Sequence, residues 1–436
     1  MKQSTCFREF ARYSTFNVLG MLGLSCYILA DTFFVSQGLG INGLTALNLA
    51  IPIYSFIHGS GLMIGMGGGT RYSIRKYQEN RRVTDAIFTN SLYMAGVLAL
   101  LFVLAGLFLP GRLAGLLGAD QAVFAMTETY LRVILLFGPA FLLNNILLCF
   151  VRNDGAPQRS MAAMLGGSFS NVILDYLFIF PCNMGIFGAA FATGLAPIIS
   201  MLILAPHFLR GKNGFRPVAC RWDGAAITGI LSSGVPSLII EASSGVVMIV
   251  FNTVILSLQG NTGVAAYGVI ANLSLVMTAI YTGIAQGVQP LLSGRFGAGK
   301  LGDVRRILGY ALTAMLLLSA LLYGGMFLGA EQIAALFNSE HSAELQRMAV
   351  QGLRLYFLAC PFVGFNVILP VYFTSTDYAR PAQVITLLRG FFLAIPATLL
   401  LAKAAGMTGV WCAFPATEFL VAGVGLVAWL NKYRKK

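Results

Sequence analysis

Four acidic residues lie deep inside long apolar stretches of the sequence: Asp31, Asp175, Glu241 and Glu418. A charged side chain in hydrocarbon costs at least about 2.5–3.5 kcal/mol, so each one needs a partner, a proton or a water-filled cavity. A purely structural acid would be neutral and hydrogen-bonded, or paired with an arginine. Such a structural role competes with a functional one more strongly at Glu241 and Glu418 than at Asp31 and Asp175. The sequence neighbours of the two aspartates are better suited to an ion site.

Polar side chains accompany Asp31 and Asp175 at helical spacing. Tyr27 precedes Asp31 by one helical turn and Asn171 precedes Asp175 by one turn, so each pair shares a helix face. Thr193 lies in the next apolar stretch. Oxygen ligands of these types could hold a hard cation such as Na⁺, and two neighbouring carboxylates could instead share a proton. The sequence predicts an ion site for Na⁺ or H⁺ and leaves that choice open.

The second half of the chain carries its own polar residues within apolar surroundings, and the chain is rich in Phe (32), Tyr (16) and Met (16). Acids among aromatic and thioether groups suit large lipophilic cations, through charge pairing and cation–π contact. The competing interpretation is that most Phe and Met residues simply face lipid or neighbouring helices. The predicted substrate-binding residues are Asp31, Asp175, Glu241, Gln286, Gln289 and Glu418.

The elements that must position these residues are apolar helices. Only 10% of the 436 residues are charged, against roughly 25% in soluble domains, and 57% are hydrophobic. Runs of about 20 uncharged residues match the length of a helix that crosses a bilayer, whereas a barrel would show short alternating strands. We therefore expect an all-α polytopic membrane protein. Its twelve predicted transmembrane spans are 13–36, 44–70, 86–109, 130–151, 160–181, 186–208, 229–257, 264–292, 307–328, 349–373, 382–401 and 408–430.

A repeat of half the chain length organises these spans. Leu131-Arg132-Val133 recurs as Leu353-Arg354-Leu355, and the glycine pair Gly185 and Gly188 recurs as Gly406 and Gly409. Six spans in each half give both halves the same orientation, so the predicted pseudo-twofold axis runs along the membrane normal. The polar stretch 209–224 separates the halves. We expect an N-lobe over 1–215, a C-lobe over 216–436 and a substrate path between them.

The net charge of +13 is distributed by topology. When successive spans are assumed to cross the membrane in opposite directions, most Lys and Arg residues fall on one side of the membrane. That side also holds both termini. This is the positive-inside pattern, so we expect a multi-pass protein of the cytoplasmic (inner) membrane with both termini in the cytoplasm. The same distribution argues against nucleic acid as a partner. Because the path lies within one chain, we expect a monomer embedded in the lipid bilayer.

No catalytic or nucleotide-binding motif accompanies the buried acids. The sequence contains no Walker, HExxH or GxSxG pattern, and its seven cysteines are scattered without CxxC spacing. We therefore expect neither an enzyme nor a cofactor. Transport energy would come from an ion gradient or from the gradient of the substrate itself.

Several motifs resemble those of the MATE (multidrug and toxic compound extrusion) transporters. Arg152–Thr193 contains R-x-x-G-x-P, then N-x-x-x-D-x-x-x-I, then G-x-x-G-A-A-x-A-T. Ala30–Val35 (ADTFFV) resembles the first-helix motif of the family, and Leu388-Arg389 with Gly406–Glu418 resembles its last two helices. The similarity extends over the whole chain and leans towards the bacterial branch of MepA-type exporters.

The resemblance implies a two-lobed, twelve-helix fold that alternates between outward-open and inward-open states. It also implies secondary active multidrug efflux, the export of organic cations in exchange for H⁺ or Na⁺. The family's N-lobe ion site matches Tyr27, Asp31, Asn171, Asp175 and Thr193. Some relatives use a glutamate in span seven, where Glu241 lies, but the aspartate that they pair with it has no match between 353 and 373.

Two other functions remain open at this point. Related two-lobed families flip lipid-linked oligosaccharides, whose phosphates call for Lys or Arg at membrane depth. Here Arg132, Arg354 and Arg389 are the candidates. A receptor or scaffold that transports nothing is the third alternative, and it predicts no substrate flux in reconstituted vesicles.

Overall fold

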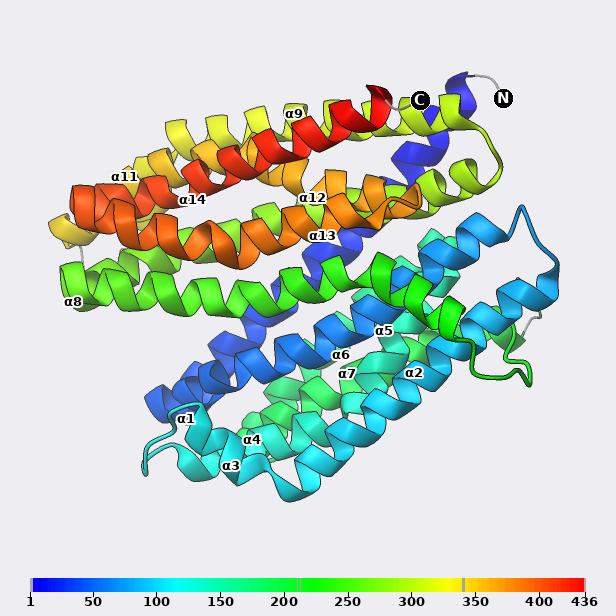
Figure 1. Ribbon diagram of the computed structural model, residues 1–436. Coiled ribbons are helices and arrows are strands. Elements are labelled where there is room, and N and C mark those ends of the chain that lie inside the picture. The colour runs from blue at the N-terminus through cyan, green and yellow to red at the C-terminus, as the bar shows by residue number, and fades with distance from the viewer. Residues whose placement is uncertain (1–2, 210, 212, 339–341, 435–436) are drawn as a thin grey trace.

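The computed structural model describes residues 3–209, 211, 213–338 and 342–434, and in these ranges the chain is helical without strands. The helices form two bundles that lie side by side (Figure 1). Helices of the N-lobe are α1 Gln3–Arg75, α2 Arg81–Phe108, α3 Pro110–Leu116, α4 Phe124–Leu136, α5 Gly138–Asn153, α6 Pro157–Ile179 and α7 Gly185–Leu209.

The C-lobe contains the remaining helices, with a short 3₁₀ turn before α12 and a π-helical turn after α13. Their bounds are α8 Gly224–Gly297, α9 Leu301–Leu328, α10 Ala330–Phe337, α11 Ala343–Tyr356, η1 Phe357–Ala359, α12 Cys360–Ser375, α13 Ala379–Leu387, η2 Leu388–Phe392 and α14 Ala394–Arg434.

Twelve membrane spans follow from these helices. Within the described ranges, nine helical segments are long and apolar enough to cross a bilayer, and α4 with α5 supplies a tenth span bent by 48°. Two of the nine, Thr5–Arg75 and Ala379–Lys432, turn back on themselves at a break and so supply two spans each (Figure 1). The predicted all-α, twelve-span, two-lobed fold is thereby confirmed.

Glycines in the left-handed region make the sharpest reversals. The backbone of α1 leaves helical geometry at Gly40 (φ 66°), and that of α8 leaves it at Gly260 (φ 59°). Only glycine adopts this region without a steric cost, which explains why each helical hairpin turns at a glycine. Gly40 and Gly260 each break the first long helix of their half, so the two halves share this hairpin.

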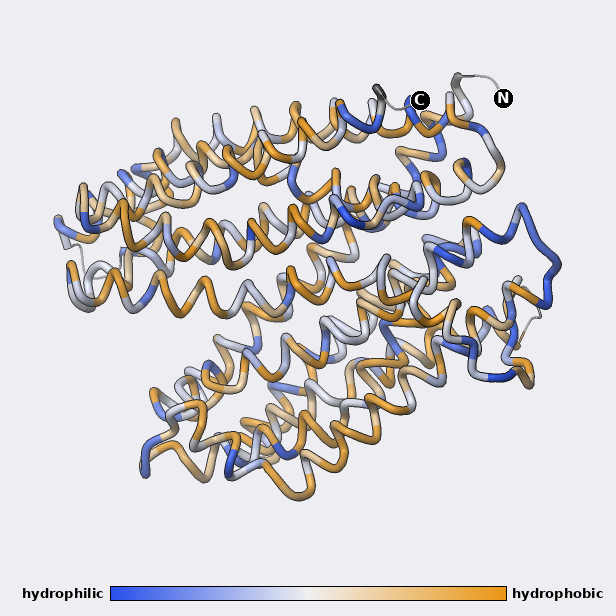
Figure 2. Tube along the Cα trace, viewed as in Figure 1, coloured by the Kyte–Doolittle hydropathy of each residue, from blue (hydrophilic) through white to orange (hydrophobic). Residues whose placement is uncertain are grey.

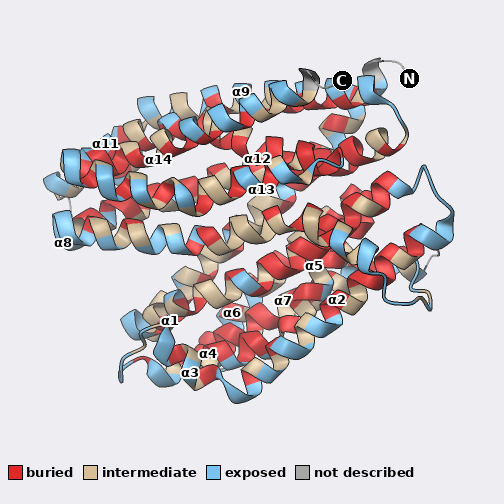
Figure 3. Ribbon diagram, in the orientation of Figure 1, coloured by how far each residue is buried: buried red, intermediate tan, exposed pale blue. Residues whose placement is uncertain are grey.

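Each lobe has its own apolar core, while the outer surface is also apolar. Buried residues lie along the inner faces of the bundles (Figure 3), and exposed aliphatic side chains such as Leu321 (72% exposed) lie on the outer faces. Hydrophilic residues gather at the helix ends and in the connecting segments (Figure 2). This is the distribution of a bundle whose sides contact hydrocarbon and whose ends contact water.

The two lobes touch most closely at the end where α1 begins and α14 ends, and they diverge from there (Figure 1). We call this contact between the lobes the seam. Here Gly67 of α1 packs against the backbone of Ile230 in α8, and Gly234 of α8 packs against the backbone of Met63 in α1. Small residues let two helices approach to backbone contact. The backbones of the two lobes therefore meet at these glycines, and the lobes are closed at this end.

A methyl group at Gly234 is expected to force the seam apart. The new Cβ of Gly234→Ala would collide with the carbonyl group of Met63, and overpacking of this kind costs about 1–3 kcal/mol. Thermal unfolding in detergent measures the loss. Gly245→Ala is the matched control in the same helix, because no atom lies within 4 Å of a Cβ placed there. Equal unfolding temperatures for the two variants would contradict the close seam.

Candidate functional site

Asp31 and Asp175 meet inside the N-lobe. Asp31 is 7% exposed and Asp175 is fully buried, and their carboxyl groups lie within hydrogen-bonding reach of each other. The first span of α1 carries one acid and α6 carries the other. These helices approach closely because α1 places glycines against α6, so that Gly20 faces Met164 and Gly23 faces Leu165.

Asn171 and Thr193 complete the surroundings of Asp175. With its amide oriented to satisfy both neighbours, Asn171 donates from Nδ2 to Oδ2 of Asp175 at 3.0 Å and accepts from the backbone N–H of Thr193 at 3.3 Å. The Thr193 hydroxyl donates to the carbonyl oxygen of Ala189 at 3.0 Å. Oδ1 of Asp31 and Oδ1 of Asp175 are both buried and have no hydrogen-bond partner. These two oxygens therefore remain able to share a proton or to coordinate a cation.

Tyr27 points to a residue that the sequence analysis missed. Its hydroxyl group lies 2.7 Å from the hydroxyl group of Tyr54, which belongs to the second span of α1. The Tyr54 ring stacks on His58 at 6.0 Å between ring centroids, and Nδ1 of His58 lies 3.3 Å from Nδ2 of Asn145. Tyr54 and His58 are one helical turn apart, the spacing that singled out the acid pairs, so a usable signal was present.

Glu241 lies on the C-lobe side of the seam, opposite these residues. It is partly exposed, and its side chain packs against Gly59 of α1, next to His58. Glu241 is thus the predicted C-lobe acid that lies against the second span of α1.

Gln286 and Gln289 lie elsewhere, at the closed end of the seam. Gln286 accepts a hydrogen bond of 2.8 Å from Arg152 of the N-lobe. Gln289 accepts a hydrogen bond of 2.9 Å from Asn153 and donates one of 2.8 Å to Thr70. Both glutamines therefore bridge the lobes in this state, and their predicted part in substrate binding remains a prediction.

Glu418 is buried within the C-lobe. Nε of Arg389 lies 2.6 Å from Oε1 of Glu418, and Asn366 donates to Oε2 of Glu418 at 2.7 Å. The π-helical turn Leu388–Phe392 carries Arg389. Glu418 therefore has the arginine partner that the structural interpretation required, and a second role in substrate binding remains a prediction.

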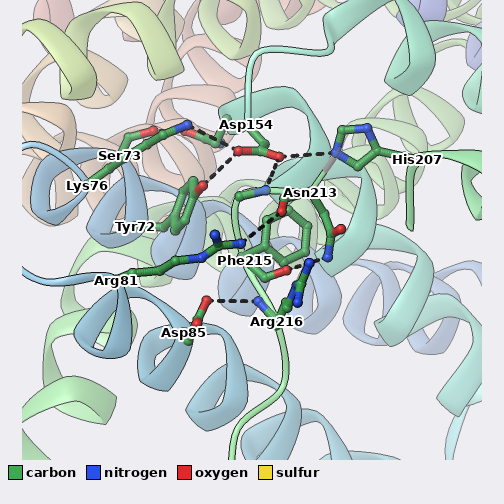
Figure 4. A network of polar contacts seen from close by, with 12 residues as sticks. Tyr72, Ser73, Lys76, Arg81, Asp85, Asp154, His207, Asn213, Phe215 and Arg216 are labelled. Carbon is green, nitrogen blue, oxygen red and sulfur yellow. Dashed lines mark hydrogen bonds and ion pairs between the residues drawn. The ribbon is translucent and has the colours of Figure 1, made fainter. Parts of the chain in front are cut away.

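A further carboxylate, that of Asp154, ties the segment between the lobes to the N-lobe (Figure 4). Its oxygens accept hydrogen bonds from Tyr72 at 2.8 Å and from the backbone N–H of Gly214 at 2.7 Å. Nε2 of His207 lies 3.1 Å from Oδ2 of Asp154, and Nζ of Lys76 lies 3.1 Å from Oδ1. The network holds the start of the connection to α8 against α1 and α7.

Asp154 makes the stability of the protein depend on pH. Burial alone would raise the pKa of Asp154, but hydrogen bonds from His207, Gly214 and Tyr72, with the charge of Lys76, hold that pKa below its usual value. A depressed folded-state pKa gives stability that is present above the unfolded value of about 4 and is lost as the pH falls through the folded value.

We therefore expect Asp154→Asn to lower the free energy of unfolding at pH 7 by on the order of 2 kcal/mol. The deficit should begin to narrow below about pH 4, where Asp154 of the unfolded chain becomes protonated, and should close as the pH falls through the lower pKa of the folded state. Thermal unfolding at a series of pH values measures both effects. Asp120→Asn, in the exposed segment before α4, is the control and should show neither. A deficit that does not change with pH would contradict the assignment.

Comparisons with known proteins place the chain in a family. The sequence pattern of the MatE family matches residues 18–177 and 236–400. The multidrug export protein MepA of Staphylococcus saprophyticus is 25% identical over 437 residues, covering 99% of this chain and 96% of MepA. MepA of Staphylococcus aureus (strain NCTC 8325 / PS 47) is 24% identical over 436 residues, with the same coverage.

Solved structures have the same fold. A multidrug resistance MATE family transporter of the MOP superfamily in an outward-facing conformation superposes with a TM-score of 0.91, at 22% identity and over 98% of this chain and 96% of that one. A MOP superfamily transporter from Pyrococcus furiosus, described as having a binding pocket of reversed polarity, gives a TM-score of 0.90 at 22% identity over 97% and 95% of the two chains. With the family pattern matched over most of its length, the chain belongs to the MatE family and is a multi-pass membrane transporter, not an enzyme.

Proposed function

We propose that this transporter exports organic cations from the cytoplasm in exchange for H⁺, which binds between Asp31 and Asp175. The observation that carries the proposal is the placement of these two buried carboxyl groups within hydrogen-bonding reach, each with one unpartnered oxygen. Two ionised carboxylates repel each other strongly in a buried site, so one shared proton stabilises the pair. The relatives named MepA support export of drugs as the task.

The donor set favours H⁺ over Na⁺. A hard cation needs several oxygen ligands that are free to coordinate it. Here the Tyr27 hydroxyl group is engaged with Tyr54, and the Thr193 hydroxyl group donates to Ala189. The Asn171 amide oxygen accepts from the backbone of Thr193. These bonds hold the hydroxyl and amide groups to other partners, whereas the two carboxyl groups face each other, an arrangement that suits a shared proton.

Acidic residues at the seam favour a cationic substrate. Glu241 is partly exposed there, and the aromatic rings of Tyr54 and His58 lie opposite it, which suits charge pairing and cation–π contact.

A lipid-linked phosphate is disfavoured by the pairing of the candidate arginines. Each of the three lies against a glutamate, and these pairs are Arg132 with Glu128, Arg354 with Glu331 and Arg389 with Glu418.

Exchange requires the proton to favour one conformation over the other, because an ion that binds both states equally shifts neither. The seam is closed at the end that holds both termini, and the positive-inside pattern of the sequence supports a cytoplasmic location for that end. We infer that the described state is open outward, that the protein lies in the cytoplasmic membrane and that it acts as a monomer. Proton binding at Asp31 and Asp175 then favours release of the drug outside.

Flux measurements in proteoliposomes test the proposal. Export of ethidium should follow an imposed pH gradient and should ignore an imposed Na⁺ gradient of equal size. Flux that follows only Na⁺ would overturn the choice of ion. Binding of a lipid pyrophosphate in preference to ethidium would overturn the choice of substrate in favour of a flippase.

Tyr54→Phe is expected to slow export while barely affecting folding. The change removes the hydroxyl group that hydrogen-bonds to Tyr27. Tyr27 lies beside the ion site, and Tyr54 lies on the side of the N-lobe that faces Glu241. One buried hydroxyl hydrogen bond contributes about 1 kcal/mol to stability. Tyr281→Phe is the matched control, because Tyr281 makes an equally short 2.7 Å bond to Ser319 within the C-lobe. Equal export rates for the two variants, at similar unfolding temperatures, would exclude a specific role for Tyr54.

A further inference from the structure

The first span of α1 belongs to both lobes. Near its beginning, Phe10 is part of the C-lobe core, with Tyr13 and Val18 packed against that core. Further along, Val35 is part of the N-lobe core. Asp31 lies on the N-lobe portion of the same helix. One span therefore carries an ion-site residue at one end and a docking surface for the other lobe at its other end.

The docking on the C-lobe is tight. Glu9 forms an ion pair of 2.5 Å with Arg295 at the end of α8. A Cβ at Gly283 would lie 2.5 Å from Cα of Val18, and a Cβ at Gly287 would lie 2.8 Å from Cα of Ser14. Such backbone contact leaves little freedom for sliding, so the beginning of α1 is expected to follow α8 when the lobes move.

The span is also unbroken. It contains no proline, and the first departure from helical backbone geometry in α1 occurs at Gly40. At 1.5 Å per residue, the helix from Gln3 to Leu39 is about 55 Å long. It can therefore transmit a displacement of Asp31 to the C-lobe.

Arg152 sits where this helix crosses between the lobes. It lies near the end of α5, is 1% exposed, and donates from one terminal nitrogen to Oδ1 of Asn17 and to Oε1 of Gln286, both at 2.8 Å. It thus joins an N-lobe helix, the first span of α1 and the C-lobe. Its other terminal nitrogen faces the sulfur atoms of Met66 and Cys149, and its Nε has no partner.

A buried guanidinium group held only by neutral partners is costly and unusual. Among the described residues, no carboxylate forms an ion pair with Arg152, whereas the partly buried Arg389 has Glu418. Water would stabilise this charge as soon as the lobes separated at the closed end. Arg152 thus makes several hydrogen bonds in the closed state, and water can replace them when the lobes separate. Such a contact can form and break in each transport cycle.

We propose that Arg152 is a positioning residue for exchange: it fastens the first span of α1 to the C-lobe in the closed state, so that proton binding at Asp31 and opening of the seam occur together. This proposal rests on the proposed exchange of drug for H⁺. Without Arg152, the ion site and the drug site remain, but they are no longer linked.

Arg152→Gln tests the proposal in the full-length protein. We expect ethidium to bind with an affinity within about twofold of wild type, while pH-driven export falls about tenfold, a split that loss of about 1.4 kcal/mol of coupling produces. Alkylation of Cys149, buried beside Arg152, should become several times faster, and mass spectrometry reads this site separately from the other cysteines. Arg152→Lys, which retains the charge, should restore part of the export.

Two further variants make the test specific. Gln286→Ala should reproduce the phenotype and should not add to Arg152→Gln, because both remove the same contact. Arg159→Gln should behave like wild type, since Arg159 contacts His207 within the N-lobe and does not cross the seam. Wild-type export and alkylation rates in Arg152→Gln would overturn the proposal, as would parallel loss of binding and export.

The experiment separates this proposal from the proposed function. Alkylation of Cys149 reports seam opening in any buffer and needs no proton gradient. If wild-type protein showed no pH-driven export, the proposed exchange would fail, although faster alkylation in Arg152→Gln would still place the contact at the seam. If export is pH-driven but Arg152→Gln leaves both readouts unchanged, only the role of Arg152 fails.

Discussion

Replacing Asp31 or Asp175 by asparagine is expected to abolish pH-driven export. Asparagine retains the size and hydrogen-bonding capacity of the side chain but cannot bind and release a proton, so the gradient no longer favours one conformation. Export should fall about tenfold or more, because even 1.4 kcal/mol of lost coupling changes an equilibrium tenfold. The initial rate of ethidium export from proteoliposomes under a fixed pH gradient measures the effect.

Glu128→Gln is the matched control for these variants. Glu128 is an acid of the same lobe, in an exposed ion pair with Arg132, and its loss should leave export unchanged. Both aspartate variants should still unfold near the wild-type temperature, because removing one of two facing carboxylates also removes repulsion. Export at the wild-type rate in both Asp31→Asn and Asp175→Asn would exclude this pair as the coupling site.

Breaking the pair between Arg389 and Glu418 is expected to have the largest effect on folding. Removing one member of a buried ion pair leaves the other charge without compensation and costs about 3–5 kcal/mol. Glu418→Gln would leave Arg389 facing a neutral amide in the C-lobe. We expect a much lower unfolding temperature and a low yield of folded protein in detergent.

The exposed pair of Arg132 and Glu128 again provides the comparison. Pairs of that kind contribute about 0–1 kcal/mol, so Arg132→Gln should unfold close to the wild-type temperature. A Glu418→Gln protein that is fully stable but binds ethidium weakly would contradict a structural role. It would support the prediction that Glu418 contacts substrate.

The fold could be predicted from sequence because lipid imposes simple constraints. A helix must present about 20 apolar residues to cross hydrocarbon, so hydropathy alone locates the spans. The repeat then fixed their grouping into two lobes. The glycine reversals at Gly40 and Gly260 lie between predicted spans, and the structure places a turn at each.

Contacts across the molecule were harder to predict. Asp31 and Asp175 could be grouped because a buried acid is costly and each had a polar neighbour one turn away. Gln286 and Glu418 look equally polar in the sequence, yet their partners Arg152 and Arg389 lie on other helices. Apolar patterning does not say which face of a membrane helix meets a neighbour, since lipid and protein interiors are both apolar.

The roles of Tyr54 and Arg152 could not be predicted from sequence, for two different reasons. Tyr54 carries no charge, so its burial in a membrane helix is not costly enough to mark it in the sequence, although its partner His58 lies one turn away. Arg152 lies at the end of a span, where arginine usually meets water and counts towards topology. In the structure, Arg152 is buried instead, because α1 and α8 pack around it.

Proton release on drug binding is the most direct measurement of the central claim. Purified protein in weakly buffered detergent solution is mixed with ethidium, and the pH is followed with an indicator dye. Exchange at Asp31 and Asp175 predicts that wild-type protein releases protons as ethidium binds, and that the double variant Asp31→Asn with Asp175→Asn releases none. Binding without proton release in wild type, or undiminished release in the double variant, would contradict the account.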